Sequence, residues 1–317
     1  MTVSRDPRAR VIVVAGEALI DLIVGADGTL AAIPGGGPYN TAIAIARLGG
    51  MVTFLGRIST DRFGRDLRAN LARDGVAVDG VVPTDDPTTL AVAELDESGV
   101  AHYRFYVDGT SAPGLTDADA AGLVMAGSAA ALHVGTLGLV LEPIGTTIER
   151  LVRVADPSRL VMLDPNCRPT ATPDLDAFRA RIERIAGRAD VVKVSDDDLR
   201  FLAPDADPDA TIDRLLELGV RVVLRTHGSD DVQIRMPSGR ATVPVPAVDV
   251  VDTVGAGDAF GGGFLASWTG AGLGRDDLAS MDLVSDSVRM AVRVAALSCA
   301  RPGADPPTLA ELEGFPG

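Results

Sequence analysis

The stretch Val250–Ala266, "VVDTVGAGDAFGGGFLA", is the densest glycine run of the chain and leads into an apolar segment. Its "GAG" turn permits a tight backbone, and "DAFGGGFLASW" is typical of a helix start. Amide groups at a helix N-terminus, with the helix dipole behind them, favour an anion. The stretch therefore predicts a phosphate-binding turn followed at once by Asp258. Taken alone, Asp258 has a plainer explanation, because an acid in the first helical turn stabilises a helix by about 0.3–1 kcal/mol.

Composition limits the classes of protein that remain. The 317 residues, 46% of them hydrophobic, can bury a large core as one α/β domain, with or without an appendage. A formal net charge of −15 argues against non-specific binding to nucleic acid or to an anionic membrane. No signal peptide and no run of about 20 apolar residues is present. The only cysteines, Cys167 and Cys299, lack metal-ligand spacing. We therefore expect a cytoplasmic protein with reduced thiols and no nucleic-acid or membrane partner.

Short β-branched runs alternate with longer helical patterns. The segment 38–50 predicts a helix with Pro38 in its first turn and Gly49 at its C-terminal cap, and 282–304 predicts a long helix near the C-terminus. Alternation over this length predicts a mostly parallel sheet with helices on both sides. The expected strands are 11–16, 51–56, 130–135, 160–164, 191–195 and 220–226.

Two stretches break this alternation. Residues 18–35 and 88–111 alternate apolar and polar side chains, with Asp27–Gly28 and Ser98–Gly99 as hairpin turns. We interpret them as a small β-sheet inserted into the α/β core, where it could act as a lid. No internal repeat or low-complexity linker appears, so the chain is expected to form a single domain, 1–317.

The single lysine excludes the P-loop and protein-kinase motifs, and the dinucleotide motif fits poorly. A P-loop needs Gly-Lys before Ser or Thr, and a protein kinase needs a strand lysine paired with a glycine loop. The only lysine, Lys193, fits neither pattern. A dinucleotide motif starting at Gly255 would need Gly or Ala where Phe260 stands. Such a motif lies on the first βα turn of its fold, whereas Gly255 lies late in the chain.

Two long motifs resemble those of the ribokinase-like (PfkB-type) carbohydrate kinases. "DTVGAGDAFGGGFL" (252–265) resembles their C-terminal signature, and "GGGPYNTAIAIARLG" (35–49) resembles their N-terminal glycine signature. The two occur in the right order and the resemblance covers essentially the whole chain. It implies a three-layer α/β/α sandwich, with a mostly parallel central sheet and a small β-sheet lid, that transfers the γ-phosphate of ATP to a sugar hydroxyl. The segments most similar to fructokinases are "GEALIDLI" (16–23), "DPNCRP" (164–169) and "KVSDDDL" (193–199).

The resemblance implies a catalytic role for residues of the opening stretch. Asp258 corresponds to the base that takes a proton from the sugar hydroxyl, which contributes about 10²–10⁴-fold. An ordinary aspartate pKa of about 3.9 would keep it ionised at neutral pH. The amides of Gly255, Ala256 and Gly257 correspond to an anion hole for the transferred phosphoryl group. Arg168 corresponds to an arginine near that phosphate or near a substrate anion, although a surface arginine is the plainer explanation.

The resemblance also implies a sugar site. A carboxylate and an amide can fix adjacent hydroxyls, while glycines let the sugar ring approach the backbone. Each residue alone could be a solvated strand residue, a helix-start residue or a turn, but their joint spacing favours the site. The expected sugar-binding residues are Asp21, Gly35, Gly36, Asn40, Tyr106, Arg168 and Asp258.

For the nucleotide, Thr226 and Gly228 in "LRTHGSDDV" resemble a phosphate-contacting Thr-x-Gly turn, although Asp231 replaces a later glycine. Ser195 and Asp198 stand where many relatives carry an Asn-x-x-Glu pattern linked to magnesium. Asp198 could still organise water around Mg²⁺, but the acidic run around it could equally begin a helix.

Asp252 and Gly303 match positions that hold a monovalent cation in relatives, so the expected cofactors are ATP, Mg²⁺ and K⁺. The open edge of the predicted lid could pair with a second copy, as in dimeric relatives.

The identity of the sugar depends on a few hydrogen bonds. Fructose is the first expectation. A 2-keto-3-deoxygluconate kinase would need an arginine where Val107 stands, although Arg104 and Arg168 are nearby. Ribose comes third, and a nucleoside is disfavoured because the predicted lid has few stacking aromatics. A sugar-binding protein without catalysis is the alternative of another class, and the intact glycine turn before Asp258 argues against it.

Overall fold

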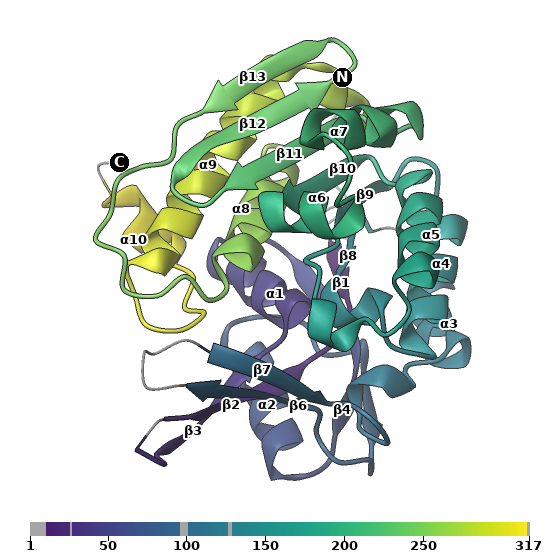
Figure 1. Cartoon of the computed structure of the whole chain (residues 1–317), viewed down its shortest axis with the longest axis vertical. Helices are drawn as coiled ribbons and strands as arrows, with labels where there is room; N and C mark the ends of the chain where they lie inside the picture. The colour runs from purple at the N-terminus through teal and green to yellow at the C-terminus, as the bar shows by residue number, and fades with distance from the viewer. Residues whose placement is uncertain (1–10, 26, 96–100, 126–128, 316–317) are drawn as a thin grey trace.

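The computed structural model describes residues 11–25, 27–95, 101–125 and 129–315. A nine-stranded sheet with the order β13-β12-β11-β10-β9-β8-β1-β4-β5 forms its centre (Figure 1). Neighbouring strands are parallel from β11 to β5, and β12 and β13 are antiparallel. The α/β class with a mostly parallel sheet is thereby confirmed. The strands are β1 (Ile12–Ala15), β4 (Val52–Ser59), β5 (Val81–Thr84), β8 (Ala131–Gly135), β9 (Leu160–Asp164), β10 (Val191–Ser195), β11 (Val222–His227), β12 (Asp230–Met236) and β13 (Gly239–Val243).

Helices cover both faces of this sheet, because the central strands are apolar on both sides. In β1, Ile12 and Val14 join one core cluster and Val13 and Ala15 join the other. All six strands expected from the sequence are present. The first face carries α1 (Gly37–Arg47), α2 (Arg62–Arg73), α8 (Ala256–Gly270) and α9 (Met281–Cys299). The second face carries α3 (Asp117–Met125), α4 (Ile144–Val154), α5 (Leu175–Ala186), α6 (Asp196–Leu202) and α7 (Pro208–Glu217). The short helix α10 (Leu309–Glu313) follows α9.

The predicted ends of α1 are confirmed. Pro38 lies in its first turn. Gly49 follows its last turn with a φ of 80°, a left-handed conformation that glycine adopts without strain. Its N–H donates to Ala46 O at 2.9 Å, which satisfies one of the free carbonyls at the helix end.

The glycine run after Asp258 serves helix packing. A Cβ on Gly262 would lie 2.6 Å from Ala44 Cβ of α1, and one on Gly263 would lie 3.0 Å from Ala291 Cα of α9. Larger residues would push these helices apart. The run therefore brings α8 into close contact with α1 and α9 and sets the position of its N-terminus.

The antiparallel hairpin β12–β13 is an element that sequence reasoning missed. The stretch "LRTHGSDDV", which we expected to be a phosphate turn, covers the end of β11, the hairpin turn and the start of β12. Its Gly228 has a φ of 64°. The alternation of buried Val232, Ile234 and Met236 with polar neighbours is typical of an outer strand that covers only one core face.

A second sheet, with the order β3-β2-β6-β7, lies at the lower end of the molecule in Figure 1. The Asp27–Gly28 turn is confirmed: Asp27 Oδ1 accepts a hydrogen bond from the Thr29 N–H at 3.0 Å, and Gly28 has a φ of 81°. The predicted Ser98–Gly99 turn lies outside the described residues. Both segments expected to form the small sheet contribute to it, as β2 (Leu19–Val24), β3 (Leu30–Gly35), β6 (Leu90–Leu95) and β7 (Ala101–Tyr106).

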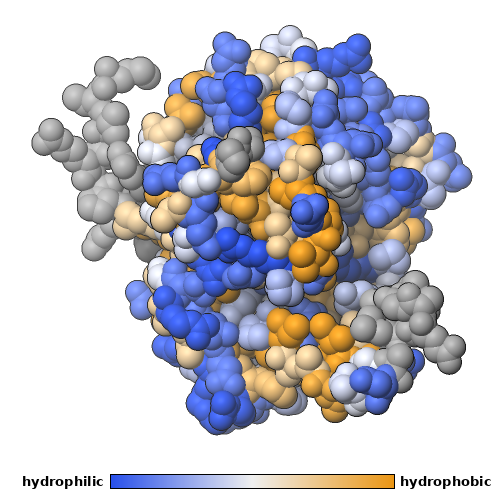
Figure 2. Space-filling view, turned by 90° about the vertical axis from the view of Figure 1, so that its left-hand side faces the viewer, coloured by the Kyte–Doolittle hydropathy of each residue, from blue (hydrophilic) through white to orange (hydrophobic). Residues whose placement is uncertain are grey.

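Hydrophobic side chains gather at the level of this small sheet on the face shown in Figure 2. Leu30 on β3 is 68% exposed. An apolar, uncovered strand is compatible with pairing to a second copy, and the dimer stays a prediction. Within the described ranges, no helix has the length and hydropathy that crossing a bilayer requires.

Candidate active site

The carboxyl ends of the central strands meet the N-termini of α1 and α8 beside the small sheet. A cavity of about 1020 Å³ opens there. Ligands of open α/β sheets bind at this edge because the loops that follow the strands converge there. The expected site residues that line it are Asp21, Gly36, Asn40, Arg168, Ser195, Asp198, Gly255, Gly257 and Asp258.

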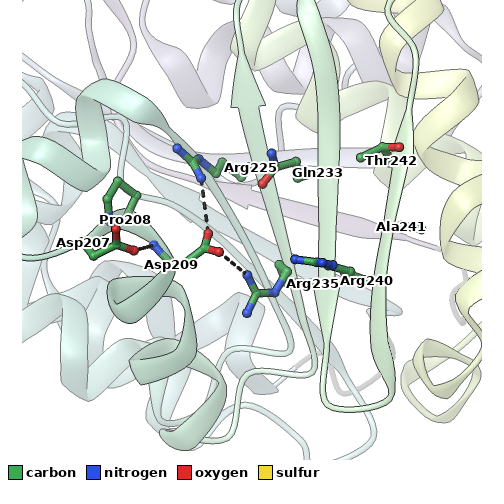
Figure 3. Close-up of a pocket in the computed structure, with 9 residues that line it drawn as sticks. All are labelled: Asp207, Pro208, Asp209, Arg225, Gln233, Arg235, Arg240, Ala241 and Thr242. Atoms are coloured by element: carbon green, nitrogen blue, oxygen red, sulfur yellow. Dashed lines mark hydrogen bonds and ion pairs between the residues drawn. The ribbon is translucent and has the colours of Figure 1, made fainter.

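A second hollow of about 710 Å³ lies between α7 and the β11–β13 edge (Figure 3). Three of its charged groups pair with one another: Asp209 pairs with Arg225 at 3.4 Å and with Arg235 at 3.1 Å. Asp207 caps α7 by accepting from the N–H of Asp209. None of the expected site residues lines this hollow, so the first cavity is the candidate site.

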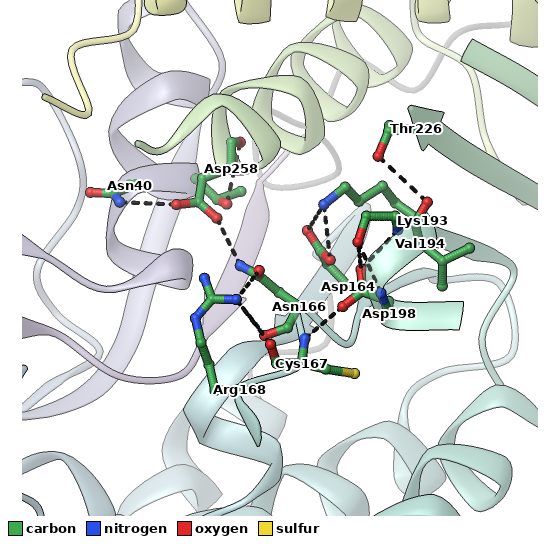
Figure 4. A network of polar contacts seen from close by, with 12 residues as sticks. Asn40, Asp164, Asn166, Cys167, Arg168, Lys193, Val194, Asp198, Thr226 and Asp258 are labelled. Atoms are coloured by element: carbon green, nitrogen blue, oxygen red, sulfur yellow. Dashed lines mark hydrogen bonds and ion pairs between the residues drawn. The ribbon is translucent and has the colours of Figure 1, made fainter. Parts of the chain in front are cut away.

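Asp258 lies at the centre of the site, in the first turn of α8 (Figure 4). Only 7% of its surface is exposed. Its Oδ2 accepts a hydrogen bond from Asn40 Nδ2 at 2.9 Å, and its Oδ1 accepts one from Asn166 Nδ2 at 3.4 Å. Residues from the starts of α1 and α8 and from the end of β9 thus meet at one carboxyl group.

The pKa of Asp258 differs from the ordinary value that we expected. Burial raises it to about 7. The hydrogen bond from Asn40 opposes this rise, Asp164 adds to it, and Lys193 opposes it. A carboxyl group with this pKa is a far better proton acceptor at neutral pH than an ordinary aspartate.

The glycine turn before Asp258 approaches other parts of the chain closely. Gly255 has a φ of 74°, and a Cβ there would lie 2.5 Å from Ala304 Cβ. The N–H of Ala256 donates to Thr253 O at 3.2 Å. The three predicted anion-hole amides are therefore not equivalent, since Ala256 already has a partner within the turn and only Gly255 and Gly257 line the cavity.

Sequence reasoning missed the place of Lys193, which is buried directly beneath this turn. A Cβ on Gly257 would lie 2.8 Å from Lys193 Nζ. The ammonium group contacts both carboxylate oxygens of buried Asp164, at 3.2 and 3.1 Å. Burial would lower the pKa of Lys193, but Asp164 and Asp198 outweigh it and raise the pKa, so the ammonium is charged. A lone lysine between valines of a buried strand was the signal available in the sequence.

The loop after β9 carries Arg168. Its Nη1 donates to three acceptors, which are Asn166 Oδ1 at 2.7 Å, Asn166 O at 3.1 Å and Cys167 O at 3.1 Å. The guanidinium is therefore held against its own loop, at one side of the cavity. Sequence reasoning missed the contact of Asn166 with Asp258.

Asp198 anchors this loop to β10. Its Oδ1 accepts from the N–H of Cys167 at 2.6 Å, and its Oδ2 accepts from the N–H and the hydroxyl of Ser195 at 2.8 and 2.7 Å. Burial would raise its pKa, but Lys193 and these hydrogen bonds outweigh it and lower the pKa. Both oxygens of the expected magnesium residue thus already accept hydrogen bonds. Within the described ranges, no group of three or more His, Cys, Asp or Glu side chains is placed to hold a metal ion.

Asp21 enters the cavity from β2 of the small sheet. Burial raises its pKa to about 6, and the nearby Arg168 opposes this rise. A Cβ on Gly35 would lie 2.0 Å from Asp21 Oδ2, so the carboxylate needs a glycine there. Gly36 has a φ of 110° and lines the cavity beside Asp21.

The aromatic side chains of the small sheet lie differently from the expectation. Tyr106 is half exposed and does not line the cavity. Tyr103 and Phe105 do, because side chains alternate between the two faces of β7. Their rings stack with centroids 6.4 Å apart and 17° between planes. The alternation could have been recognised in "YRFY", but the face that meets the cavity depends on how the sheet packs.

Glu17 was also missed. It is 1% exposed and lines the cavity. Its Oε1 accepts from the N–H of Gly37 at 3.2 Å and its Oε2 from that of Gly138 at 2.9 Å. Burial raises its pKa to about 8. It joins the start of α1 to the turn after β8.

Several expected residues lie outside the cavity lining. The Thr226 hydroxyl donates to Val194 O at 3.5 Å, beside the end of β10. Asp252 and Gly303 are joined, since Asp252 Oδ2 accepts from the Gly303 N–H at 2.8 Å. The expected residues that do not line the cavity are Gly35, Tyr106, Thr226, Gly228, Asp252, Ala256 and Gly303.

This arrangement suits one kind of chemistry. A buried carboxyl group that titrates near neutral pH can take a proton from an alcohol. The amides at the α8 N-terminus and the ammonium beneath them favour an anion beside it. The site can therefore bring a hydroxyl nucleophile to a negatively charged electrophile.

Comparison with known proteins agrees with this chemistry. The family model described as "pfkB family carbohydrate kinase" matches residues 9–311. A fructokinase of Rhizobium leguminosarum bv. trifolii is 38% identical over 261 residues, which are 81% of this chain and 79% of that protein. A fructokinase structure with bound ATP from Xylella fastidiosa superposes with a TM-score of 0.89 at 30% identity, covering 96% of this chain and 98% of that one. An aminoimidazole riboside kinase from Salmonella enterica, complexed with aminoimidazole riboside and an ATP analogue, gives a TM-score of 0.83 at 26% identity, covering 96% and 99%.

Proposed function

The chain belongs to the pfkB family of carbohydrate kinases, and from this premise we propose that it phosphorylates fructose with ATP. The observation that carries the proposal is the buried Asp258 at the N-terminus of α8, between Asn40 and the glycine turn. The fructokinase relatives support the choice of sugar. The sugar lies between Asp21 and Asp258, and the γ-phosphate lies at the turn.

In this mechanism Asp258 takes the proton of the sugar hydroxyl while that oxygen attacks the γ-phosphorus. Asp21, Asn40 and the Gly36 backbone fix the other hydroxyls. The amides at the turn and the Lys193 ammonium stabilise the charge that develops on the transferred phosphoryl group. Arg168 lies at the edge of the cavity, where it can approach the transferred phosphate or an anionic group of the substrate.

We infer the cation sites from the ligand atoms that the cavity and its surroundings offer. Mg²⁺ keeps several waters and binds mainly through substrate phosphates, so it needs no protein cage. The engaged oxygens of Asp198 support this arrangement, in which Asp198 at most holds a water of the ion. When bound, Mg²⁺ neutralises phosphate charge. For K⁺ we propose a site near Asp252 and Gly303. The Gly303 N–H donates a hydrogen bond to Asp252 Oδ2, which joins the two residues near the glycine turn.

A neutral sugar fits the cavity better than an acidic one. Arg104 alternates with Tyr103 and Phe105 along β7 and does not line the cavity. The arginines that line it are Arg168 and Arg200. Asn166 already holds the guanidinium of Arg168, and Asp197 pairs with that of Arg200. Both observations disfavour 2-keto-3-deoxygluconate.

A riboside with an aromatic base is the second candidate. The stacked pair Tyr103–Phe105 faces the cavity and offers the platform that the sequence was expected to lack. The similarity to an aminoimidazole riboside kinase points the same way.

Turnover with a panel of sugars tests the proposal. We expect ADP release with fructose, and a kcat/KM for fructose above those for ribose, 2-keto-3-deoxygluconate and aminoimidazole riboside. A higher value for the riboside would establish the second candidate. If no sugar stimulates ADP release, the proposed enzymatic function is contradicted.

The activity should depend on pH through Asp258. The base acts only when ionised, and burial raises its pKa to about 7. We therefore expect kcat/KM for fructose to be constant above pH 8 and to fall about tenfold per pH unit well below pH 7. A profile that stays flat down to pH 5 would contradict the role of Asp258 as base.

The small sheet should close over the bound sugar, which would exclude water from the phosphate. We expect amide hydrogen exchange in β2, β3, β6 and β7 to slow about fivefold or more with saturating fructose. The distant β12–β13 hairpin serves as the internal control. Equal exchange in the small sheet with and without sugar would exclude a lid.

We propose a cytoplasmic location. Cys167 and Cys299 are free thiols, which is typical of proteins in a reducing compartment. Pairing of two copies through the small sheet stays a prediction.

A further inference from the structure

The two oxygens of Asp258 are held unequally. Oδ2 accepts a hydrogen bond of 2.9 Å from Asn40, whereas the donor to Oδ1, Asn166 Nδ2, lies 3.4 Å away. A nitrogen–oxygen distance of about 2.9 Å is typical, and bonds beyond about 3.2 Å are weak. Oδ1 is therefore the oxygen that an incoming hydroxyl can engage without breaking a strong contact.

The orientation of the Asn166 amide is imposed by Arg168. A guanidinium can only donate, so the amide atom that it contacts at 2.7 Å must be the oxygen. The amide nitrogen of Asn166 then has to face Asp258. Arg168 thus determines that Asp258 meets a donor and not a second acceptor.

The backbone of Asn166 is in an unusual conformation that places the side chain between these two groups. Its φ is 40°, in the left-handed region where non-glycine residues are uncommon and asparagine is among the most tolerant. The loop is fastened on both sides of it, by the ion pair of Asp164 with Lys193 and by the hydrogen bond from the Cys167 N–H to Asp198.

We propose that Asn166 is a positioning residue, oriented by Arg168, that aims Asp258 Oδ1 at the acceptor hydroxyl. This inference rests on the proposed function, in which Asp258 is the base. In the reaction the hydroxyl proton moves to Oδ1 and its oxygen bonds to the γ-phosphorus. The bond from that phosphorus to the bridging oxygen breaks, with its electrons leaving on ADP. Asn166 neither gives nor receives a proton.

The first variant to test is Asn166→Asp. Aspartate tolerates the same backbone conformation and still accepts from Arg168, but it places a second carboxylate against Asp258. Like charges at this distance disfavour ionisation. We expect the acid limb of kcat/KM to move at least about one pH unit upward, with kcat near pH 7 at least about fivefold lower. The other charged groups near Asp258, namely Glu17, Asp164, Lys193 and Arg168, are unchanged.

Two further variants separate positioning from backbone structure. Asn166→Gly adopts the left-handed conformation without strain but removes the amide, so we expect kcat at the alkaline plateau to fall about tenfold while the KM for fructose changes little. Asn70→Asp on α2 is the matched control, because Asn70 Oδ1 also accepts from an arginine, Arg73, away from the site. We expect the wild-type profile from it.

The outcomes distinguish this inference from the proposed function. A wild-type protein without sugar-dependent ADP release would overturn both. With an active wild-type enzyme, an Asn166→Gly variant at the full plateau, or an Asn166→Asp profile that coincides with that of Asn70→Asp, would overturn the role of Asn166 alone.

Discussion

Asp258→Asn is expected to lower kcat for fructose by about 10²–10⁴-fold, because the asparagine amide cannot take the hydroxyl proton. The shape of the side chain and the acceptor for Asn40 are kept, so the Kd for ATP and for fructose should stay within about threefold. The measurement is steady-state turnover at pH 8, where the wild-type carboxyl is ionised, together with calorimetric binding. A variant that keeps its kcat would show that another group is the base.

The stability of this variant serves as its control. Since burial raises the pKa of Asp258 from 3.8 to about 7, the folded protein favours the protonated acid. The ionised form then costs stability increasingly as pH rises from about 4 to 7, and the full cost is present above pH 7. Asparagine removes that cost, so the Tm at pH 8 should be at least as high as that of the wild type. A loss of kcat with an unchanged or higher Tm cannot come from unfolding.

Removing the charge of Lys193 is expected to have the second large effect. The ammonium lies directly under the turn that would hold the transferred phosphoryl group, and removal of one such stabilising group typically costs about 10²–10³-fold in kcat. Lys193→Met alone leaves Asp164 as an unpaired buried acid, which costs about 3–5 kcal/mol of stability. A folding defect in the single variant is therefore expected.

The double variant Lys193→Met with Asp164→Asn isolates the catalytic effect. It removes both buried charges, so most of the stability should return. Asp164 raises the pKa of Asp258 and Lys193 lowers it, so their joint removal should leave the acid limb nearly in place. We expect a folded enzyme with the wild-type pH profile shape and a kcat still about 10²-fold lower. A double variant with full turnover would exclude Lys193 from phosphate stabilisation.

Local patterns predicted much of the fold. The six central strands and the capped helix α1 follow from short-range alternation, glycine and proline, and all are present. The hairpin β12–β13 was missed because the stretch in which β12 begins was interpreted as a phosphate-contacting turn. The glycine run of α8 was expected within the helix start, but its packing role was not predicted: Gly262 and Gly263 allow the close contacts with α1 and α9.

The candidate site was predicted only where local sequence motifs carry its residues. Residues within recognisable motifs, such as Asn40 and Asp258, meet in one cavity although they lie 218 positions apart. Tyr106 was expected at the sugar and Tyr103 was missed, because a strand pattern separates its two faces without telling which face meets the cavity. Glu17 was passed over because its partners are two backbone amides, and backbone positions leave no trace in a sequence.

The sequence by itself determined the six central strands, the family and the identity of the central acid, since these depend on side-chain type and spacing along the chain. The tertiary structure decided the proton affinity of Asp258, the place of Lys193 beneath Gly257 and the orientation of Asn166. Those properties arise from desolvation and from charges on other strands and helices, whose distances exist only once the chain has folded.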